Sequence, residues 1–158
     1  MKRLLATVFA VSLAGSVAAS VGFEFGANFF KPSAGGAQVT EGQNFLVNWQ
    51  LDNDLALGVY TETSDWAIGA ATGTLTVSAI QVAKGVMKGV NVALNIGSGN
   101  DGAGNAALID VLGSVTILSG SGEKVKGSLK GVAAARFCNA TPLSMDGVNL
   151  GLAVGLEF

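Results

Sequence analysis

The side chains available for catalysis are limited, because the 158 residues include serine, aspartate and lysine but no histidine. Histidine is the usual general base near neutral pH and the commonest metal ligand. The remaining residues form no group that predicts a nucleophile with its base. Cys138 is the single cysteine, which excludes an intrachain disulfide. We therefore predict a protein that is not an enzyme and that holds no cofactor or metal.

One segment matches a cofactor motif by its letters alone. Residues 97–102 (GSGNDG) fit the G-x-G-x-x-G pattern of dinucleotide-binding loops. That motif works only when a helix begins directly after it and points its N-terminus at the pyrophosphate. Residues 103–106 (AGNA) continue instead as a loop. Calcium binding at Asp101 is also not predicted, because one carboxylate seldom suffices to bind calcium. The segment is predicted to be a surface loop.

Six charged residues alternate with apolar neighbours in extended segments, and we predict that they face a common interior. These are Glu24, Asp110, Glu157, Lys126, Lys130 and Arg136. Their charges balance, as a narrow lumen requires, because an unpaired buried charge is costly. Two interpretations stay open, a structural plug and an ion path. The strand pattern described below predicts an eight-stranded barrel, whose interior is only wide enough for its own side chains or one small ligand, and this favours the plug.

The element that positions Glu157 is the clearest one in the chain. Residues 147–158 (GVNLGLAVGLEF) place an apolar residue at every second position and end on an aromatic residue. Successive side chains of a strand point to opposite faces, so one face of this segment is continuously apolar. Six such positions suffice for a tilted strand to cross a bilayer.

Seven more segments alternate in the same way, which predicts eight strands in all. The ranges are 20–30, 43–51, 54–62, 74–83, 89–97, 108–118, 124–137 and 147–158. In the fourth segment the apolar phase changes between Leu75, Val77, Ala79 and the later Ile80, Val82. We predict a β-bulge near residues 78–81 to account for this change.

The predicted connections alternate in length. Residues 31–42, 63–73, 98–107 and 138–145 form long loops, and residues 52–53, 84–88 and 119–123 form short turns. Transmembrane barrels show this asymmetry, and an even number of strands places both termini at the short-turn end. The prediction is an all-β protein, a closed up-and-down antiparallel barrel of eight strands. Trp49 and Trp66 are predicted to lie in aromatic girdles near its two ends.

The first 19 residues have the pattern of a secretory signal peptide. Lys2 and Arg3 precede an apolar stretch, and residues 17–19 (VAA) form a small-residue cleavage site. The domains are therefore a signal peptide, 1–19, cleaved near Ala19, and a barrel, 20–158. Without Lys2 and Arg3 the mature part carries 7 basic and 11 acidic residues, a net charge of −4, which argues against nucleic-acid binding.

The composition of the whole sequence points to lipid. Only 13% of the residues are charged, and the mean hydropathy is +0.50. A soluble exported domain carries about a quarter charged residues. No stretch of about 18 apolar residues follows residue 19, and a closed barrel is the alternative to a helix for spanning a membrane.

The export signal, eight alternating segments and the terminal phenylalanine resemble the small outer-membrane barrels of Gram-negative bacteria, of the OmpA membrane-domain and OmpX type. The resemblance implies a bacterial outer-membrane location, contact with outer-membrane lipid and assembly by the barrel-assembly machinery. In that class the end of the last strand is the assembly signal, and the matching residues here are Leu152, Val154, Leu156 and Phe158. The family often has tyrosine where this chain has Leu156.

The function implied is a non-enzymatic one, either structural or based on an extracellular partner bound through the long loops 31–42 and 63–73. Two alternatives stay open. The first is a narrow channel for ions or small solutes. The second is a soluble secreted β-sandwich or adhesin subunit, in which alternation reflects one core-facing side.

Overall fold

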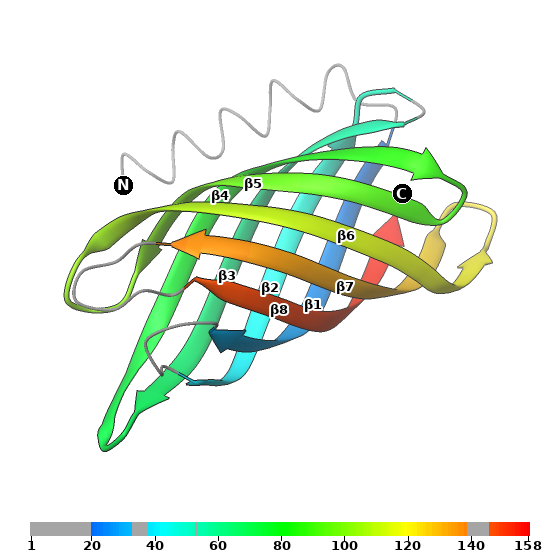
Figure 1. Cartoon of the computed structure of the whole chain (residues 1–158). Coiled ribbons are helices and arrows are strands. Elements are labelled where there is room, and N and C mark those ends of the chain that lie inside the picture. The colour runs from blue at the N-terminus through cyan, green and yellow to red at the C-terminus, as the bar shows by residue number, and fades with distance from the viewer. Residues whose placement is uncertain (1–19, 33–37, 53, 139–145) are drawn as a thin grey trace.

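The computed structural model describes residues 20–32, 38–52, 54–138 and 146–158, and they form one closed antiparallel barrel (Figure 1). Each strand pairs with its neighbours in the chain, and β8 closes the barrel on β1. The strands are β1 (Ser20–Pro32), β2 (Gln38–Gln50), β3 (Leu55–Ile68), β4 (Ala71–Met87), β5 (Val90–Asn100), β6 (Asn105–Ser121), β7 (Lys126–Cys138) and β8 (Gly147–Glu157). The predicted fold class is confirmed, and the β-sandwich alternative is wrong, because one sheet closes on itself.

The register defines how far the strands are staggered. Following paired residues once around the barrel leads from Gly22, through Asn48 on β2 and Arg136 on β7, to Pro32. The path returns to β1 displaced from residue 22 to residue 32, or 10 positions. Such a stagger requires strands tilted by about 35–45° from the barrel axis and leaves an interior that side chains can fill.

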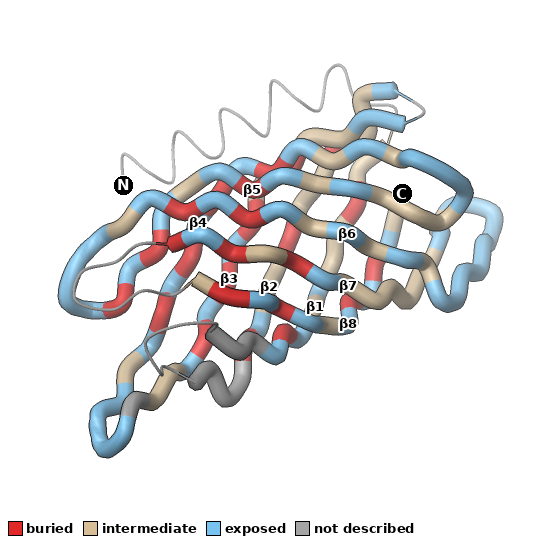
Figure 2. The backbone as a smooth tube through the Cα atoms, in the orientation of Figure 1, coloured by how far each residue is buried: buried red, intermediate tan, exposed pale blue. Residues whose placement is uncertain are grey.

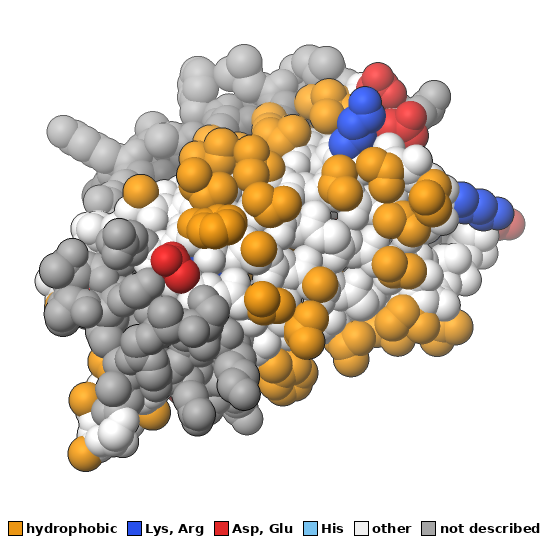
Figure 3. Space-filling view, in the orientation of Figure 1, with side chains coloured by type: hydrophobic (Ala, Val, Ile, Leu, Met, Phe, Trp, Pro, Cys, Tyr) orange, Lys and Arg blue, Asp and Glu red, His pale blue; other side chains and the backbone are white. Residues whose placement is uncertain are grey.

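The alternation in β8 sorts its side chains as predicted. Val148, Leu150, Leu152 and Val154 are 54%, 56%, 51% and 53% exposed on the outer face, whereas Asn149 and Ala153 are buried. Figure 2 shows the same alternation of buried and exposed positions on neighbouring strands, and Figure 3 shows apolar side chains gathered over the visible outer face. We call this surface the apolar belt; its members on other strands include Phe25, Phe29, Ile80, Val82, Leu94, Ile96, Ile109, Val111 and Phe137.

The bulge predicted near residues 78–81 is wrong. Residues 55–68 pair with residues 71–84 without any register shift, and the irregularity in β4 lies instead between Gly85 and Met87. Leu75, Val77 and Ala79 are buried in the lumen, and Ile80 and Val82 are exposed on the outer face. The apparent change of phase arises because this strand has apolar residues on its lumen side at one end and on its outer side at the other.

Two predicted long loops are also wrong. Within residues 63–73, all but the turn at Gly69 and Ala70 belongs to β3 or β4, and Gly69 has φ +57°. Within residues 98–107, only 101–104 connect β5 to β6. The strands continue through these segments, but most of their outward side chains are Thr, Ser and Asn, which are also common in loops. The sequence pattern therefore resembled a loop. Residues 38–42 are in β2 and Cys138 is in β7, while 33–37 and 139–145 lie outside the described residues, as does the predicted signal peptide.

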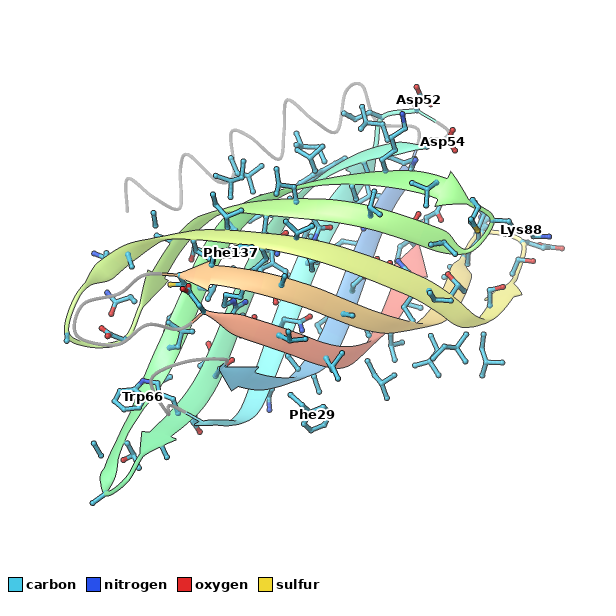
Figure 4. The ribbon with its side chains drawn as sticks, viewed as in Figure 1. Phe29, Asp52, Asp54, Trp66, Lys88 and Phe137 are labelled. Carbon is cyan, nitrogen blue, oxygen red and sulfur yellow. The ribbon has the colours of Figure 1, made fainter. Side chains whose placement is uncertain are left out.

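The barrel has two distinct ends. The terminal rim carries the start of β1, the end of β8, the connection from β2 to β3 and the turns at residues 88–89 and 122–125; the hairpin rim carries the turns at 69–70 and 101–104. Figure 4 shows Asp52, Asp54 and Lys88 at the terminal rim and Trp66 near the hairpin rim. In the described part of the chain, no helix is long and apolar enough to cross a membrane.

Candidate functional site

The centre of the lumen is occupied by Arg136, held between two carboxylates. Its Nη1 and Nη2 donate to the two oxygens of Glu62 at 2.9 and 2.7 Å, and its Nε and Nη2 donate to those of Asp110 at 2.8 and 2.9 Å. At most 1% of each of these three side chains is exposed. Two bidentate pairs on one guanidinium give a rigid, directional arrangement.

Neutral donors stabilise the carboxylates further. Tyr60 Oη and Ser64 Oγ each donate to Glu62 at 2.6 Å, and Asn28 Nδ2 donates to Tyr60 Oη at 3.0 Å. On the other side, Gln81 donates to Asn95 at 3.0 Å and Asn95 to Asp110 at 3.4 Å. Together with Arg136 these residues form what we call the buried network, which joins six strands. Glu62 and Asp110 carry two negative charges, and Arg136 neutralises only one of them. The hydrogen bonds from the neutral donors help to stabilise the remaining buried charge.

An apolar cluster closes the lumen between the buried network and the hairpin rim. Leu75, Val77, Leu108 and Cys138 are all 0% exposed, and Trp66 packs against them. The register places this plug directly beyond the network. On β4, Leu75 and Val77 lie nearer the hairpin turn than Gln81 does, and the Leu108 and Cys138 pair lies two positions beyond the Asp110 and Arg136 pair. The lumen is therefore sealed at this end by packed side chains.

The girdle predicted for Trp66 is wrong. Alternation along β3 gives Trp66 the same face as Glu62 and Ser64, which is the lumen face. Its ring lies against Gly73, where a Cβ would collide with it. Trp49 does keep the outward phase, although only 4% of it is exposed.

The six charged residues expected in the lumen fall into three separate groups along it. Arg136 and Asp110 lie in the buried network, Lys130 pairs with Glu24 nearer the terminal rim, and Lys126 Nζ lies 3.1 Å from Glu157 at that rim. Asn48 also donates to Glu24 at 3.4 Å, and Ser20 to Glu157 at 2.8 Å. They form a graded series from buried to exposed pairs and not one network.

Sequence reasoning missed Glu62, the carboxylate most deeply engaged with Arg136. The signal was present, since Gly58, Tyr60 and Glu62 alternate on one face of the segment predicted as strand three. Its partner lies 74 positions away, and no local pattern predicts a pair at that separation.

The terminal half of the lumen is hollow. An inner cavity of about 190 Å³ extends from Asp110 and Asn149 down to Gln50 and Asp54. A wider vestibule of about 640 Å³ opens at the terminal rim and shares four lining residues with the inner cavity, namely Glu24, Asn48, Gln50 and Lys130. In the described part of the chain, the lumen is thus a pocket lined by polar and apolar side chains that opens at the terminal rim.

The residues expected to form the assembly signal lie in one row on the outer face, from the middle of β8 to the terminal rim. Leu152, Val154, Leu156 and Phe158 are 51%, 53%, 40% and 59% exposed. Phe158 exchanges two backbone hydrogen bonds with Val21, of 3.0 and 3.3 Å, and so closes the seam between β8 and β1. Phe158 also contacts the ring of Phe23 edge-on.

The G-x-G-x-x-G match has no binding geometry. Residues 97–100 belong to β5, and the turn that follows leads into β6 and not into a helix. Asp101 Oδ1 accepts hydrogen bonds from the backbone nitrogens of Ala103 and Gly104, so that oxygen serves the turn. Among the described residues, no group of three or more His, Cys, Asp or Glu side chains could hold a metal ion.

Comparison with solved structures places this architecture among known barrels. The N-terminal β-barrel domain of Pseudomonas aeruginosa OprF matches with a TM-score of 0.60 at 12% identity, covering 88% of this chain and 97% of that domain. This chain has the fold of the small eight-stranded outer-membrane barrels. Neisserial surface protein A (NspA) matches with a TM-score of 0.56 at 13% identity, covering 87% of this chain and 94% of that one. No protein-family model and no curated protein matches the sequence.

Proposed function

We propose that this protein is a non-enzymatic integral protein of a bacterial outer membrane. The observation that carries the proposal is the apolar belt, which surrounds a lumen that holds the buried charged and amide side chains. A barrel leaves no unpaired strand edge in the belt, so its backbone polar groups are satisfied without water. Soluble monomers rarely expose contiguous apolar surface of more than a few hundred Å², whereas in the belt neighbouring strands expose Val, Ile, Leu and Phe side chains next to one another.

The experiment is membrane fractionation combined with gel mobility. The protein should stay with outer membranes after carbonate extraction, and unboiled samples should migrate differently from boiled ones. Recovery in the soluble periplasmic or extracellular fraction without detergent would contradict the proposal.

The sealed lumen favours a structural or interactive role over the channel alternative. The plug and the buried network fill the lumen toward the hairpin rim with packed, hydrogen-bonded side chains, although the terminal half is hollow. In planar bilayers we expect no conductance steps above background from the purified protein. Regular single-channel steps would make the channel the better function.

The surface most suited to an extracellular partner is the hairpin of β3 and β4. It replaces the predicted loop 63–73, and its outward side chains are the exposed Thr61, Thr63, Asp65, Thr74 and Thr76. Thr74 donates to Asp65 at 3.1 Å. Export through residues 1–19 with cleavage near Ala19, and recognition of Leu152 to Phe158 by the assembly machinery, complete the proposal.

A further inference from the structure

The inner cavity offers both hydrogen-bonding groups and apolar surface. Carboxamides from several strands line it, including Asn28, Asn48, Gln81, Asn91 and Asn149. Small apolar side chains lie between them, among them Ala56, Ala83, Ala93, Leu112 and Ala153. A carboxamide both donates and accepts hydrogen bonds, as a hydroxyl group does, and the apolar side chains suit C–H surface.

The charged residues at the cavity are already engaged with one another. Glu24 pairs with Lys130, and Asp110 is held by Arg136. Asp54 lies exposed at the rim. A charged ligand would therefore have to break an existing ion pair, whereas a neutral ligand would not.

The closed end of the cavity contains an acceptor without a partner. Asn149 is 5% exposed, and its Oδ1 accepts no hydrogen bond in the part of the chain that the structure describes. A buried acceptor left unsatisfied costs about 1–3 kcal/mol, which a donor brought into the cavity can recover once the side chain turns toward it. The plug prevents passage beyond this point, so a solute that enters can only be held and released.

We infer that the inner cavity binds one small, uncharged polyhydroxyl solute of about monosaccharide size, which enters from the terminal rim. The size follows from the cavity and from the single small ligand that an eight-stranded barrel can hold. This inference goes beyond the structural role proposed above. Solute binding requires only the folded barrel and not its insertion in a membrane. The binding inference and the proposed outer-membrane location can therefore fail independently.

The test is a titration of the ¹⁵N-labelled barrel in detergent micelles with D-glucose, followed by the side-chain amide resonances of Asn and Gln. We expect shifts that saturate with half-saturation at about 1–10 mM. Ala93→Leu fills the cavity and should weaken binding at least about tenfold. Ala133→Leu adds the same volume on the exposed outer face and should leave binding unchanged.

Two further comparisons define the ligand class and protect the test from misfolding. Glucosamine and glucuronate, of similar size but charged, should bind at least about tenfold more weakly than glucose. If Ala93→Leu loses its heat-dependent gel shift, Ala83→Leu at the paired position of the neighbouring strand replaces it. Shifts that do not saturate, that persist in the filled variant, or that are equal for the charged sugars would each overturn the inference.

Discussion

Arg136 and Glu62 face each other across the lumen, 74 positions apart in the chain, and two hydrogen bonds of 2.7 and 2.9 Å join them. They lie on β7 and β3, which are not neighbours in the sheet. The pair therefore links opposite walls of the barrel, and its burial makes its loss expensive.

Removing the charge of Glu62 should destabilise the barrel strongly. Glu62→Gln leaves the buried guanidinium with a single carboxylate, and we expect the free energy of unfolding in micelles to fall by about 3–5 kcal/mol. Urea titration measures it. Glu157→Gln is the matched control, because Glu157 also pairs with a cation but at an exposed site, where the loss should be about 1 kcal/mol or less. Equal losses would show that burial of the Glu62 pair is unimportant.

A charge in the apolar belt should cost more than the same charge beyond it. Leu94 and Ser98 point outward from the same strand, but Leu94 pairs with Val82 and Val111, whereas Ser98 pairs with Ser78 and Ala107 near the hairpin rim. Leu94→Arg should reduce the free energy of unfolding in lipid vesicles by about 2–4 kcal/mol, and Ser98→Arg by about 0–1 kcal/mol. A larger loss of unfolding free energy for Ser98→Arg than for Leu94→Arg would contradict the apolar belt.

The plug should behave as a packed protein core. Leu108 is fully buried in it, and Leu108→Ala leaves a cavity that should cost about 2–5 kcal/mol of unfolding free energy. Ile109→Ala removes a similar volume on the outer face, where lipid fills the space, and should cost less. Urea titration of both variants in vesicles compares them directly, and the reverse order would contradict a sealed, well-packed lumen.

The final strand should matter for assembly in cells more than for the stability of the folded barrel. Phe158→Ala should reduce the heat-shifted fraction in outer membranes several-fold, while refolding of the purified variant into micelles remains close to wild type. Phe137→Ala, which removes an equally exposed aromatic from β7, serves as the control. Equal effects of Phe158→Ala and Phe137→Ala on assembly would show that Phe158 is not part of an assembly signal.

The architecture could be predicted because alternation is a local signal. Apolar residues at every second position, as from Val148 to Phe158, identify a strand and its outer face. No knowledge of the neighbouring strands is needed. The prediction failed where the polarity of the two faces changes, in β3 and β4, because Leu75 and Val77 are apolar for the plug while Thr74 and Thr76 face outward. An apolar residue does not reveal whether lipid or protein covers it.

The sequence predicted which charged residues face the lumen but not which of them pair with one another. Alternation assigned Lys130 and Arg136 to the interior, but the choice of partner depends on the stagger of 10 positions around the barrel. That stagger places Glu62 opposite Arg136 and separates the Lys130 and Lys126 pairs from them. A global property of the closed sheet thus determined the pairing.

The most direct test of a barrel that faces lipid with its apolar belt is a spin-label scan along β8. In a Cys138→Ser background, single cysteines at positions 150 to 154 would be labelled in lipid vesicles, and relaxation by molecular oxygen would be compared with relaxation by a water-soluble nickel complex. We predict high oxygen accessibility at 150, 152 and 154 and low accessibility at 151 and 153. Uniform values, or the opposite alternation with nickel highest at the three outward positions, would contradict the account.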